Sequence, residues 1–457
     1  LFRSKADTIR VLGSAGADTL VLSDYSAEGL VGIGIVFNGA GKAGGAFGGN
    51  LQIVVSRTVR AEGDKLIVET LGSGDNVNAA ALATDRAALE LIGGAGDDIL
   101  VGSRFNDVID SGLGNDTVTG GLGFDVFIDA SPAGEVDTLV EAFDFDVGLY
   151  NDKLVVGTLL NSQGSGPFEA GKSFASELAD AGDRFAAGAV VENLAHQFEV
   201  AFITGGAGNN TFVVNDLDRS IRVGAAKLSV VNWRGTATLD NGTSDGLHPE
   251  HYLVTVPFDS SAVVHIRNAA ADPADRLVIT GTDQADRFVL DVEDGGITGT
   301  VTASVVSQMR ITHRGVEAVE INTRTGDDQL RVKAIHTRTT LNTGGGDDAI
   351  ALGNDAGTLN QIDALLIVNG QGSGDHDVLT LDDTGDAGNN FGTLTGTRIT
   401  NGVAGSSVFG LMGAGGSITY SGLEALDIHL GDAPLRNIFT IESTHGEGSV
   451  TLVTSGS

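Results

Sequence analysis

Short runs of alternating apolar and polar residues recur along the chain, and most of them adjoin turns rich in glycine and aspartate. Residues 277–290 (LVITGTDQADRFVL) and 339–352 (TTLNTGGGDDAIAL) show the pattern clearly. A period of two is that of a β-strand with one buried face. Strands this short cannot bury a face alone and must stack on their neighbours. The pattern therefore predicts an all-β fold built as a parallel β-solenoid.

The clearest repeat is a run of four consecutive nonapeptides at residues 93–128: GGAGDDILV, GSRFNDVID, SGLGNDTVT and GGLGFDVFI. The sixth position of each unit is an aspartate, spaced nine residues from the next: Asp98, Asp107, Asp116 and Asp125. The eighth position is always apolar: Leu100, Ile109, Val118 and Phe127. Each unit is expected to form a turn followed by a very short strand that faces a narrow core.

Similar turns occur singly elsewhere, around Asp18, Asn210, Asp286, Asp328, Asp348 and Asp377. Aspartate and glycine are ordinary residues of tight turns, so we interpret these isolated copies as structural. A longer repeat overlies them, because the segment from Gly315 (GVEAVEIN) resembles the segment from Gly422 (GLEALDIH), 107 residues later.

One stretch breaks the β pattern. Between 169 and 198, apolar residues fall at roughly helical spacing, which predicts a small helical insertion. The chain then divides into a β-rich repeat segment at 1–91, the nonapeptide block with its terminating segment at 92–156, a mixed segment at 157–272, and two β-repeat units at 273–457.

Net charge and composition limit the classes of molecule that the chain is expected to bind. Sixty acidic and 27 basic residues give a net charge of −33, which disfavours nucleic acid and anionic membrane surfaces and favours a cation. No stretch approaches the roughly 18 consecutive apolar residues of a membrane span. The absence of cysteine excludes disulfides, zinc–thiolate sites and thiol nucleophiles.

The nonapeptide has the chemistry of a calcium site. Glycines at positions one, two and four allow positive φ and turn backbone carbonyls inward, and the aspartate at position six adds a carboxylate. Such an all-oxygen ligand set suits Ca²⁺, whereas Zn²⁺ takes histidine or cysteine. The candidate metal-site residues are Gly93, Gly94, Gly96, Asp98, Gly102, Asp107, Gly112, Gly114, Asp116, Gly120, Gly121, Gly123 and Asp125.

These units resemble the GGxGxDxUx nonapeptide of repeats-in-toxin (RTX) proteins, which fold as a parallel β-roll around calcium. The resemblance implies two nonapeptides per coil, so that Asp98 shares an ion with Asp116 and Asp107 shares one with Asp125. The second unit departs from the family's Gly-x-Gly at residues 103–105 (SRF), which makes its site the weaker candidate. Asp137 or Asp146 is expected to complete a terminal site.

The resemblance also suggests a role. Arrays of this kind are typical of large bacterial surface and secreted proteins exported by type I secretion, adhesins and matrix proteins among them. We therefore expect a non-enzymatic, calcium-dependent, extracellular or cell-surface structural or adhesive segment, whose partners are calcium and either further copies of itself or cell-surface and matrix components.

The alternative is a secreted β-helical hydrolase or lyase that uses the repeat block as a secretion and folding module. The sequence has no GxSxG elbow or P-loop. The HPEH stretch at 248–251 lacks the spacing of the metalloprotease HExxH helix.

Overall fold

The structure is a computed structural model of the whole chain. It describes residues 8–12, 19–27, 30–37, 51–56, 65–70, 72–83, 88–128, 134–160, 184–194, 198–206, 208–223, 225–242, 249–258, 260–268, 275–294, 298–304, 308–372, 374–388, 390–402, 410–431, 438–446 and 449–455.

Two long sheets of 18 strands each form the fold. The first sheet contains, in spatial order, β1 (Thr8–Leu12), β5 (Lys65–Glu69), β7 (Ala88–Ile92), β9 (Asp107–Asp110), β11 (Val126–Ile128), β16 (Val190–Leu194), β14 (Lys153–Gly157), β13 (Asp146–Leu149), β18 (Thr211–Val214), β22 (His251–Thr255), β24 (Arg276–Thr280), β28 (Ala318–Asn322), β30 (Arg338–Gly344), β32 (Leu365–Gly370), β36 (Ser417–Ser421), β35 (Arg398–Asn401), β34 (Phe391–Thr395) and β38 (Ile438–Ile441).

The second sheet contains, in spatial order, β4 (Leu51–Ser56), β3 (Leu30–Phe37), β2 (Thr19–Ala27), β6 (Asn76–Ala81), β8 (Ile99–Val101), β10 (Thr117–Thr119), β12 (Thr138–Ala142), β17 (Val200–Thr204), β21 (Thr236–Asp240), β23 (Val263–Arg267), β27 (Gln308–Arg314), β26 (Thr298–Ser304), β25 (Arg287–Glu293), β29 (Gln329–Val332), β31 (Ala349–Leu352), β33 (Val378–Asp383), β37 (Ala425–Leu430) and β39 (Val450–Ser455).

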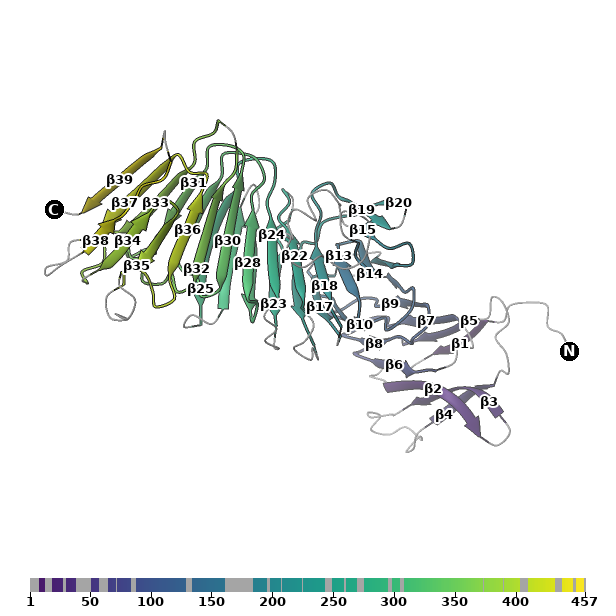
Figure 1. Cartoon of the computed structure of the whole chain (residues 1–457). Helices are drawn as coiled ribbons and strands as arrows, with labels where there is room; N and C mark the ends of the chain where they lie inside the picture. Colours follow the sequence, from purple (N-terminus) through teal and green to yellow (C-terminus); the bar gives the residue numbers. More distant parts are fainter. Residues whose placement is uncertain are drawn as a thin grey trace.

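The chain winds between the two sheets as a solenoid. From β5 to β12 successive strands alternate between the first and the second sheet, and each strand pairs in parallel with the strand one coil further on. The coils follow one another in a single curved column from β5 to β39 (Figure 1). The predicted all-β solenoid is therefore confirmed, and it is continuous across the described residues.

Within the described residues, three antiparallel insertions interrupt the parallel winding, and a fourth antiparallel unit, β2–β3–β4, forms one end of the second sheet. The pair β13–β14 enters the first sheet beside β16, and two three-stranded meanders, β25–β26–β27 and β34–β35–β36, enter the second and the first sheet respectively. A small third sheet of β15 (Arg184–Phe185), β19 (Ser220–Val223) and β20 (Ala226–Ser229) lies beside β13 and β14 (Figure 1).

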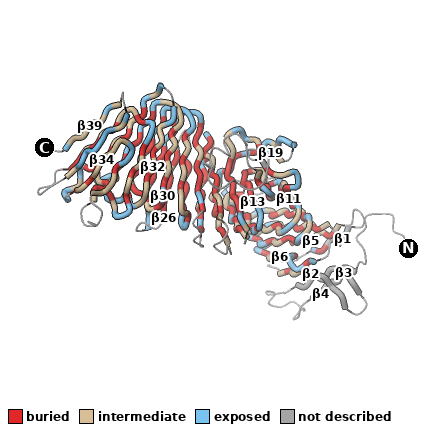
Figure 2. Tube along the Cα trace, in the orientation of Figure 1, coloured by how far each residue is buried: buried red, intermediate tan, exposed pale blue. Residues whose placement is uncertain are grey.

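The core is the space between the two sheets. Burial alternates along most strands, as Figure 2 shows, because one face of each sheet points inward. The eighth residue of every nonapeptide is buried, as the sequence predicts: Leu100, Ile109, Val118 and Phe127. Leu100 stacks on Val118, and Ile109 stacks on Phe127, in register across the parallel pairs.

The predicted helical insertion is wrong wherever the structure describes it. Residues 184–194 form β15 and β16, whereas residues 169–183 lie outside the described residues. The described segment contains the β-branched pair Val190 and Val191 within β16, which pairs with β14 on one side and β11 on the other. Two available strand edges satisfy the backbone groups of this segment better than an isolated helical turn would.

Corresponding strands of the two copies of the 107-residue repeat lie in different sheets. The first copy forms β28 in the first sheet, and the corresponding strand of the second copy is β37 in the second sheet. The two meanders also sit in opposite sheets. In the described part of the chain, no helix has the length and hydrophobicity required to cross a membrane.

A substitution at Leu341 tests whether side chains of successive coils pack on one another in the core. Leu341 lies fully buried in β30, in register between Ile321 of β28 and Val368 of β32. Replacing Leu341→Ala should reduce the free energy of unfolding by about 2–5 kcal/mol, because a cavity remains between three coils. Urea unfolding followed by circular dichroism measures this. Thr340→Ala, on the other face of the same strand, is the control, and an equally small loss in both variants would contradict the packing.

Candidate metal centre

The turns of the first and third nonapeptides stack directly on one another. They precede β8 and β10, which are parallel neighbours in the second sheet. The Gly96 N–H donates to the Leu113 carbonyl at 2.7 Å, and the Leu113 N–H donates to the Gly94 carbonyl at 2.8 Å. The pairing of turns implied by the family resemblance is therefore the one that the structure shows.

A row of carboxylates runs along this edge of the second sheet, with one acid at the entry to each successive strand. Each carboxylate accepts the backbone N–H of the acid one coil before it. The bonds run from Asp75 to Asp98 (2.7 Å), Asp98 to Asp116 (2.8 Å), Asp116 to Asp137 (2.8 Å) and Asp137 to Glu199 (3.0 Å). We call these five residues the first ladder.

These hydrogen bonds occupy only one carboxylate oxygen. In Asp98 the Oδ1 atom accepts the Asp75 N–H, whereas Oδ2 is buried and has no hydrogen-bond donor among the described residues. Asp98 is 1% exposed, and burial raises the pKa of its carboxyl to about 6. A buried anionic oxygen without a donor is costly unless a cation neutralises it.

The glycines serve two different purposes. Positive φ occurs at positions two and four of the first, third and fourth turns, with values between 100° and 140° at Gly94, Gly96, Gly112, Gly114, Gly121 and Gly123. Position one was expected to share this conformation, but Gly93, Gly102 and Gly120 do not have positive φ. A Cβ at these positions would instead overlap a carbonyl of the stacked coil or the aspartate of the same turn. Glycine is therefore required at position one because a larger side chain would not fit there.

The second and fourth turns stack on the opposite edge, at the entry to the first sheet. The Asp107 N–H donates to Asp125 Oδ1 at 2.8 Å. The Asp107 carboxylate accepts the Ser103 N–H at 2.5 Å and the Ser103 hydroxyl at 3.1 Å. The SRF departure at 103–105 thus supplies donors to the aspartate from within its own turn.

Two glutamates extend the acidic cluster above Asp125. The Glu141 carboxylate accepts the Gly120 N–H, and the Glu192 Oε2 atom is buried without a donor among the described residues. Burial, together with a smaller repulsion from neighbouring carboxylates, raises the pKa of Asp125 to about 7, of Glu141 to about 8 and of Glu192 to about 10. Sequence reasoning missed both glutamates because they lie outside the nine-residue period.

The two candidate terminal residues have different environments. Asp137 belongs to the first ladder, directly after Asp116. Asp146 lies at the start of β13, where its carboxylate accepts the N–H groups of Leu159 at 2.6 Å and Thr211 at 2.8 Å. Asp137 is therefore the residue placed to complete the stack. Sequence reasoning also missed Asp75 and Glu199, which extend the ladder at its two ends.

The donor set fits calcium. Each gap between stacked turns is lined by carboxylate oxygens and glycine-rich backbone, and no candidate ligand is a histidine or a cysteine. Ca²⁺ prefers six to eight such oxygen ligands. Asp98 and Asp116 would hold an ion on one edge, with Asp137 following Asp116, and Asp125 with Glu141 would hold one on the other. A bound ion would neutralise the negative charge of the buried carboxylates.

Asn210 and His313, outside the nonapeptide block, have structural environments. Asp18 and His248 lie outside the described residues. Asn210 is buried and donates from Nδ2 to the Gly208 carbonyl at 2.7 Å. His313 is buried in β27 and stacks on His336.

The comparison with known families agrees with this geometry. Residues 92–127 match the RTX calcium-binding nonapeptide repeat in four copies. No curated protein shows significant similarity to the chain. The family match covers the block that contains Asp98, Asp107, Asp116 and Asp125 and leaves the remaining coils unassigned.

Gly114 tests the close approach of the turns. Its φ is 129°, and a Cβ would overlap the Gly96 carbonyl of the preceding coil. Gly114→Ala should lower the free energy of unfolding by more than about 1 kcal/mol, because neither the backbone nor the neighbouring turn can accommodate alanine. Thermal unfolding in calcium measures this. Gly188→Ala is the matched control, since its Cβ would meet open space, and equal losses would contradict the stacking.

The raised pKa values predict an unusual pH dependence in the calcium-free chain. Folded-state pKa values of about 6 for Asp98, 7 for Asp125 and 8 for Glu141 lie above those of the unfolded chain. Their protonation therefore stabilises the fold at low pH, and this contribution is lost as pH rises through these values. In chelator, the melting temperature should fall between about pH 5 and about pH 8.

Calcium should remove most of this dependence, because the ion favours the charged carboxylates. Glu192→Gln should flatten the profile measured in chelator, whereas Glu442→Gln, at an exposed position, should leave it unchanged. A melting temperature that rises with pH in chelator would show that these carboxylates are not buried in the calcium-free fold.

Proposed function

We propose that the chain is a calcium-dependent extracellular structural or adhesive segment of a larger secreted or cell-surface bacterial protein. The observation that carries this proposal is the buried Oδ2 of Asp98 between two stacked turns of RTX type, a site that needs a cation. Type I secretion is the export route that RTX repeats suggest.

Calcium would couple folding to location. RTX-type turns bury carboxylates in a chain of net charge −33, so the calcium-free coils repel one another at neutral pH. Extracellular calcium modules bind with a Kd of about 10⁻⁴–10⁻³ M. At ten times Kd, each site stabilises the folded state by about 1.4 kcal/mol. A few sites rival the net stability of a domain, which is about 5–15 kcal/mol.

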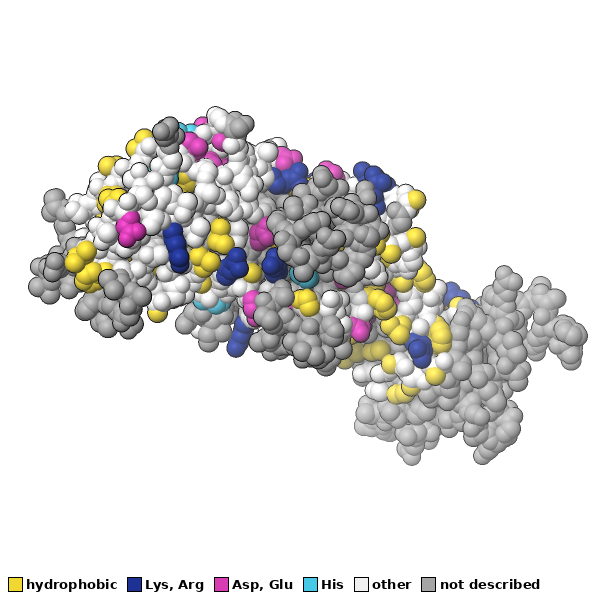
Figure 3. Space-filling view, in the orientation of Figure 1, with side chains coloured by type: hydrophobic (Ala, Val, Ile, Leu, Met, Phe, Trp, Pro, Cys, Tyr) yellow, Lys and Arg dark blue, Asp and Glu magenta, His cyan; other side chains and the backbone are white. Residues whose placement is uncertain are grey.

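A stiff rod is the mechanical product of this architecture. Parallel coils share one continuous core from Leu66 to Ile428, so a load along the axis is carried by successive strand pairs. In the view of Figure 3, acidic side chains gather at the upper edge of the C-terminal coils, and several Lys and Arg side chains lie apart from one another below them.

Assembly through the open end is the further part of this proposal. In the last described coil, Ile441, Val450 and Leu452 are exposed apolar residues. Within the described residues, β39 pairs with β37 alone, so one edge of the second sheet remains available for another strand. A further coil or a second copy of the chain would cover it.

A non-enzymatic role is also part of the proposal. The rival hydrolase or lyase would require acids that converge in a groove. A hollow of about 420 Å³ beside Tyr420, Glu424 and His445 is the place to examine, although Glu424 already accepts the Asp377 N–H at 2.8 Å. Cleavage of a polysaccharide or peptide panel by the folded chain, lost in His445→Ala, would support the rival.

A calcium titration of the purified chain tests the main proposal. Circular dichroism should show a coil-to-β transition that magnesium does not reproduce, and light scattering should show growth if the coil ends associate. Asp116→Asn should raise the calcium midpoint about tenfold, the equivalent of about 1.4 kcal/mol of lost ion binding. The variant keeps the oxygen that accepts the Asp98 N–H and removes only the charge. Equal folding in chelator and calcium would contradict the proposal.

A further inference from the structure

Two turns far from the nonapeptide block share its edge of the second sheet. Residues 323–328 (TRTGDD) precede β29, and residues 343–348 (TGGGDD) precede β31. β29 and β31 are parallel neighbours, as β8 and β10 are. These turns lie outside the residues that match the RTX repeat, and from sequence alone we interpreted them as structural.

Their backbone conformation is the same as that of the first and third nonapeptides. Positive φ occurs at positions two and four: 76° at Arg324, 126° at Gly326, 85° at Gly344 and 128° at Gly346. The Gly326 N–H donates to the Gly345 carbonyl at 2.8 Å, and the Gly345 N–H donates to the Arg324 carbonyl at 2.9 Å. These two bonds correspond in position and length to those between residues 94–96 and Leu113.

A second ladder of carboxylates accompanies these turns. Each member accepts the backbone N–H of the acid one coil before it. The bonds run from Asp286 to Asp328 (2.7 Å), Asp328 to Asp348 (2.8 Å), Asp348 to Asp377 (3.0 Å) and Asp377 to Glu424 (2.8 Å). Both ladders therefore contain four aspartates and end on a glutamate.

The outer positions correspond as well. The Gly346 N–H lies 3.4 Å from Asp375 Oδ2, as the Gly114 N–H lies 2.9 Å from Glu135 Oε2. Asp375 precedes Asp377 by two residues, and Glu135 precedes Asp137 by two. The end of the second ladder thus reproduces the end of the first, with aspartate in place of glutamate.

Buried oxygens without donors point to a ligand here. Asp328, Asp348 and Asp377 are 0–1% exposed, and the Oδ2 atom of each has no hydrogen-bond donor among the described residues. The hydroxyls of Thr323 and Thr343 lie near the first two carboxylates, but both donate to backbone carbonyls of the next coil.

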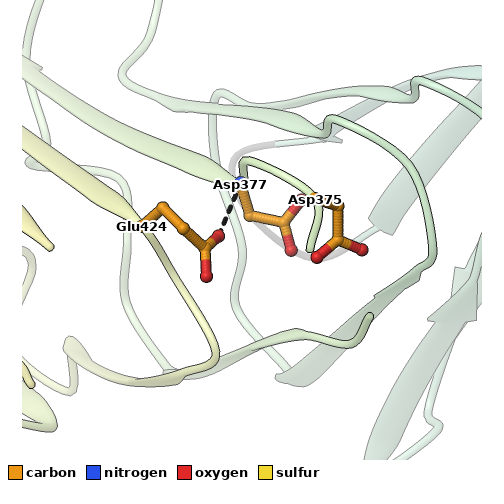
Figure 4. Close-up of side chains that lie close together, drawn as sticks. All are labelled: Asp375, Asp377 and Glu424. Carbon is orange, nitrogen blue, oxygen red and sulfur yellow. Dashed lines mark hydrogen bonds between the residues drawn. The ribbon is translucent and has the colours of Figure 1, made fainter. Parts of the chain in front are cut away.

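Three acids come together at the next turn of the second ladder, which precedes β33. Asp375, Asp377 and Glu424 each offer one oxygen, and these atoms lie within 4.8 Å of one another. Figure 4 shows the Asp377 carboxylate between the other two, with Glu424 held by the Asp377 N–H. Three carboxylates at this separation repel one another strongly unless a proton or a cation lies between them.

We propose that the second ladder is a second calcium array, with one ion between the turns at 323–328 and 343–348 and another between Asp348 and the Asp375–Asp377 pair. The proposal rests on the proposed function only for the choice of calcium among hard divalent cations. Asp328 and Asp348 would hold the first ion, and Asp348, Asp375 and Asp377 the second. Asp348 faces both gaps and is the central ligand.

The array begins at Asp328 rather than at Asp286. The turn before β25, at 281–286 (GTDQAD), resembles the second nonapeptide, GSRFND. Thr282 donates its N–H and its hydroxyl to the Asp286 carboxylate at 2.6 and 2.9 Å, as Ser103 does to Asp107. This turn satisfies its own aspartate and closes the array on that side.

Hydrogen exchange on the full chain, measured by mass spectrometry with and without millimolar calcium, tests the proposal. Calcium at ten times Kd should slow exchange in peptides covering 323–352 about tenfold, and it should do the same in peptides covering 93–119. Asp348→Asn should abolish the effect in the first set of peptides and leave it in the second. Asp116→Asn should do the reverse, and Asp427→Asn, a charge-matched strand position, should change neither.

The two proposals fail in different ways. Calcium protection at 93–119 without protection at 323–352 would overturn the second array and leave the proposed function standing, whereas no protection in either set would overturn both. In chelator, Asp348→Asn should melt at or above the parent temperature, because asparagine keeps the oxygen that accepts the Asp328 N–H. Asp377→Asn is a second variant with the same expected loss of protection, and retained protection in both variants would contradict the assigned ligands.

Discussion

The backbone N–H at the entry to each strand is the group on which the ordered stacking of these turns depends. Where a glycine-rich turn feeds a strand, this N–H points at the next coil rather than at a strand partner, and it needs an acceptor that reaches across the gap. Aspartate is short enough to supply one from the same position of the neighbouring turn. The Asp98–Asp116 and Asp328–Asp348 bonds, both 2.8 Å, are two instances of one solution.

This solution buries negative charge, and the need for a cation follows from that burial. One carboxylate oxygen holds the coils in register, and the other lies in the gap without a donor, as in Asp98 and Asp377. Asn210 does not perform the first task, because its side-chain oxygen is buried without a donor among the described residues and its side-chain nitrogen bonds within its own turn. The structural and the cation-binding interpretations of the aspartates are therefore compatible. One carboxylate oxygen accepts the N–H of the neighbouring coil, and the other can bind a cation.

The sequence predicted the parts of this arrangement that follow a constant period. The spacing of nine residues predicted the stacked pair Asp98 and Asp116 and the buried eighth positions. Glu199 and Glu424 escaped prediction because insertions separate them from the preceding ladder members by 62 and 47 residues. The helical insertion was wrong because strand edges, invisible in a local pattern, take up residues 184–194. The length of each coil determines which turns stack on one another. Because the coils differ in length, a fixed sequence period cannot predict these pairs.

On the edge of the second sheet that carries both ladders, the coils between them stack without this device, although at the first sheet the Glu250 N–H still donates to Asp275 Oδ1 at 2.8 Å. Before β21 and β23 the same edge of the second sheet carries Trp233, Gly235 and Ala262 in place of carboxylates, and Trp233 and Ala262 are fully buried. In a solenoid, stability is close to a sum over neighbouring interfaces, so an apolar interface keeps its strength when calcium is absent, whereas a carboxylate interface loses it. Calcium bound at the two ladders, as proposed, would therefore stabilise the flanking coils and leave the apolar interfaces around Trp233 and Ala262 unchanged.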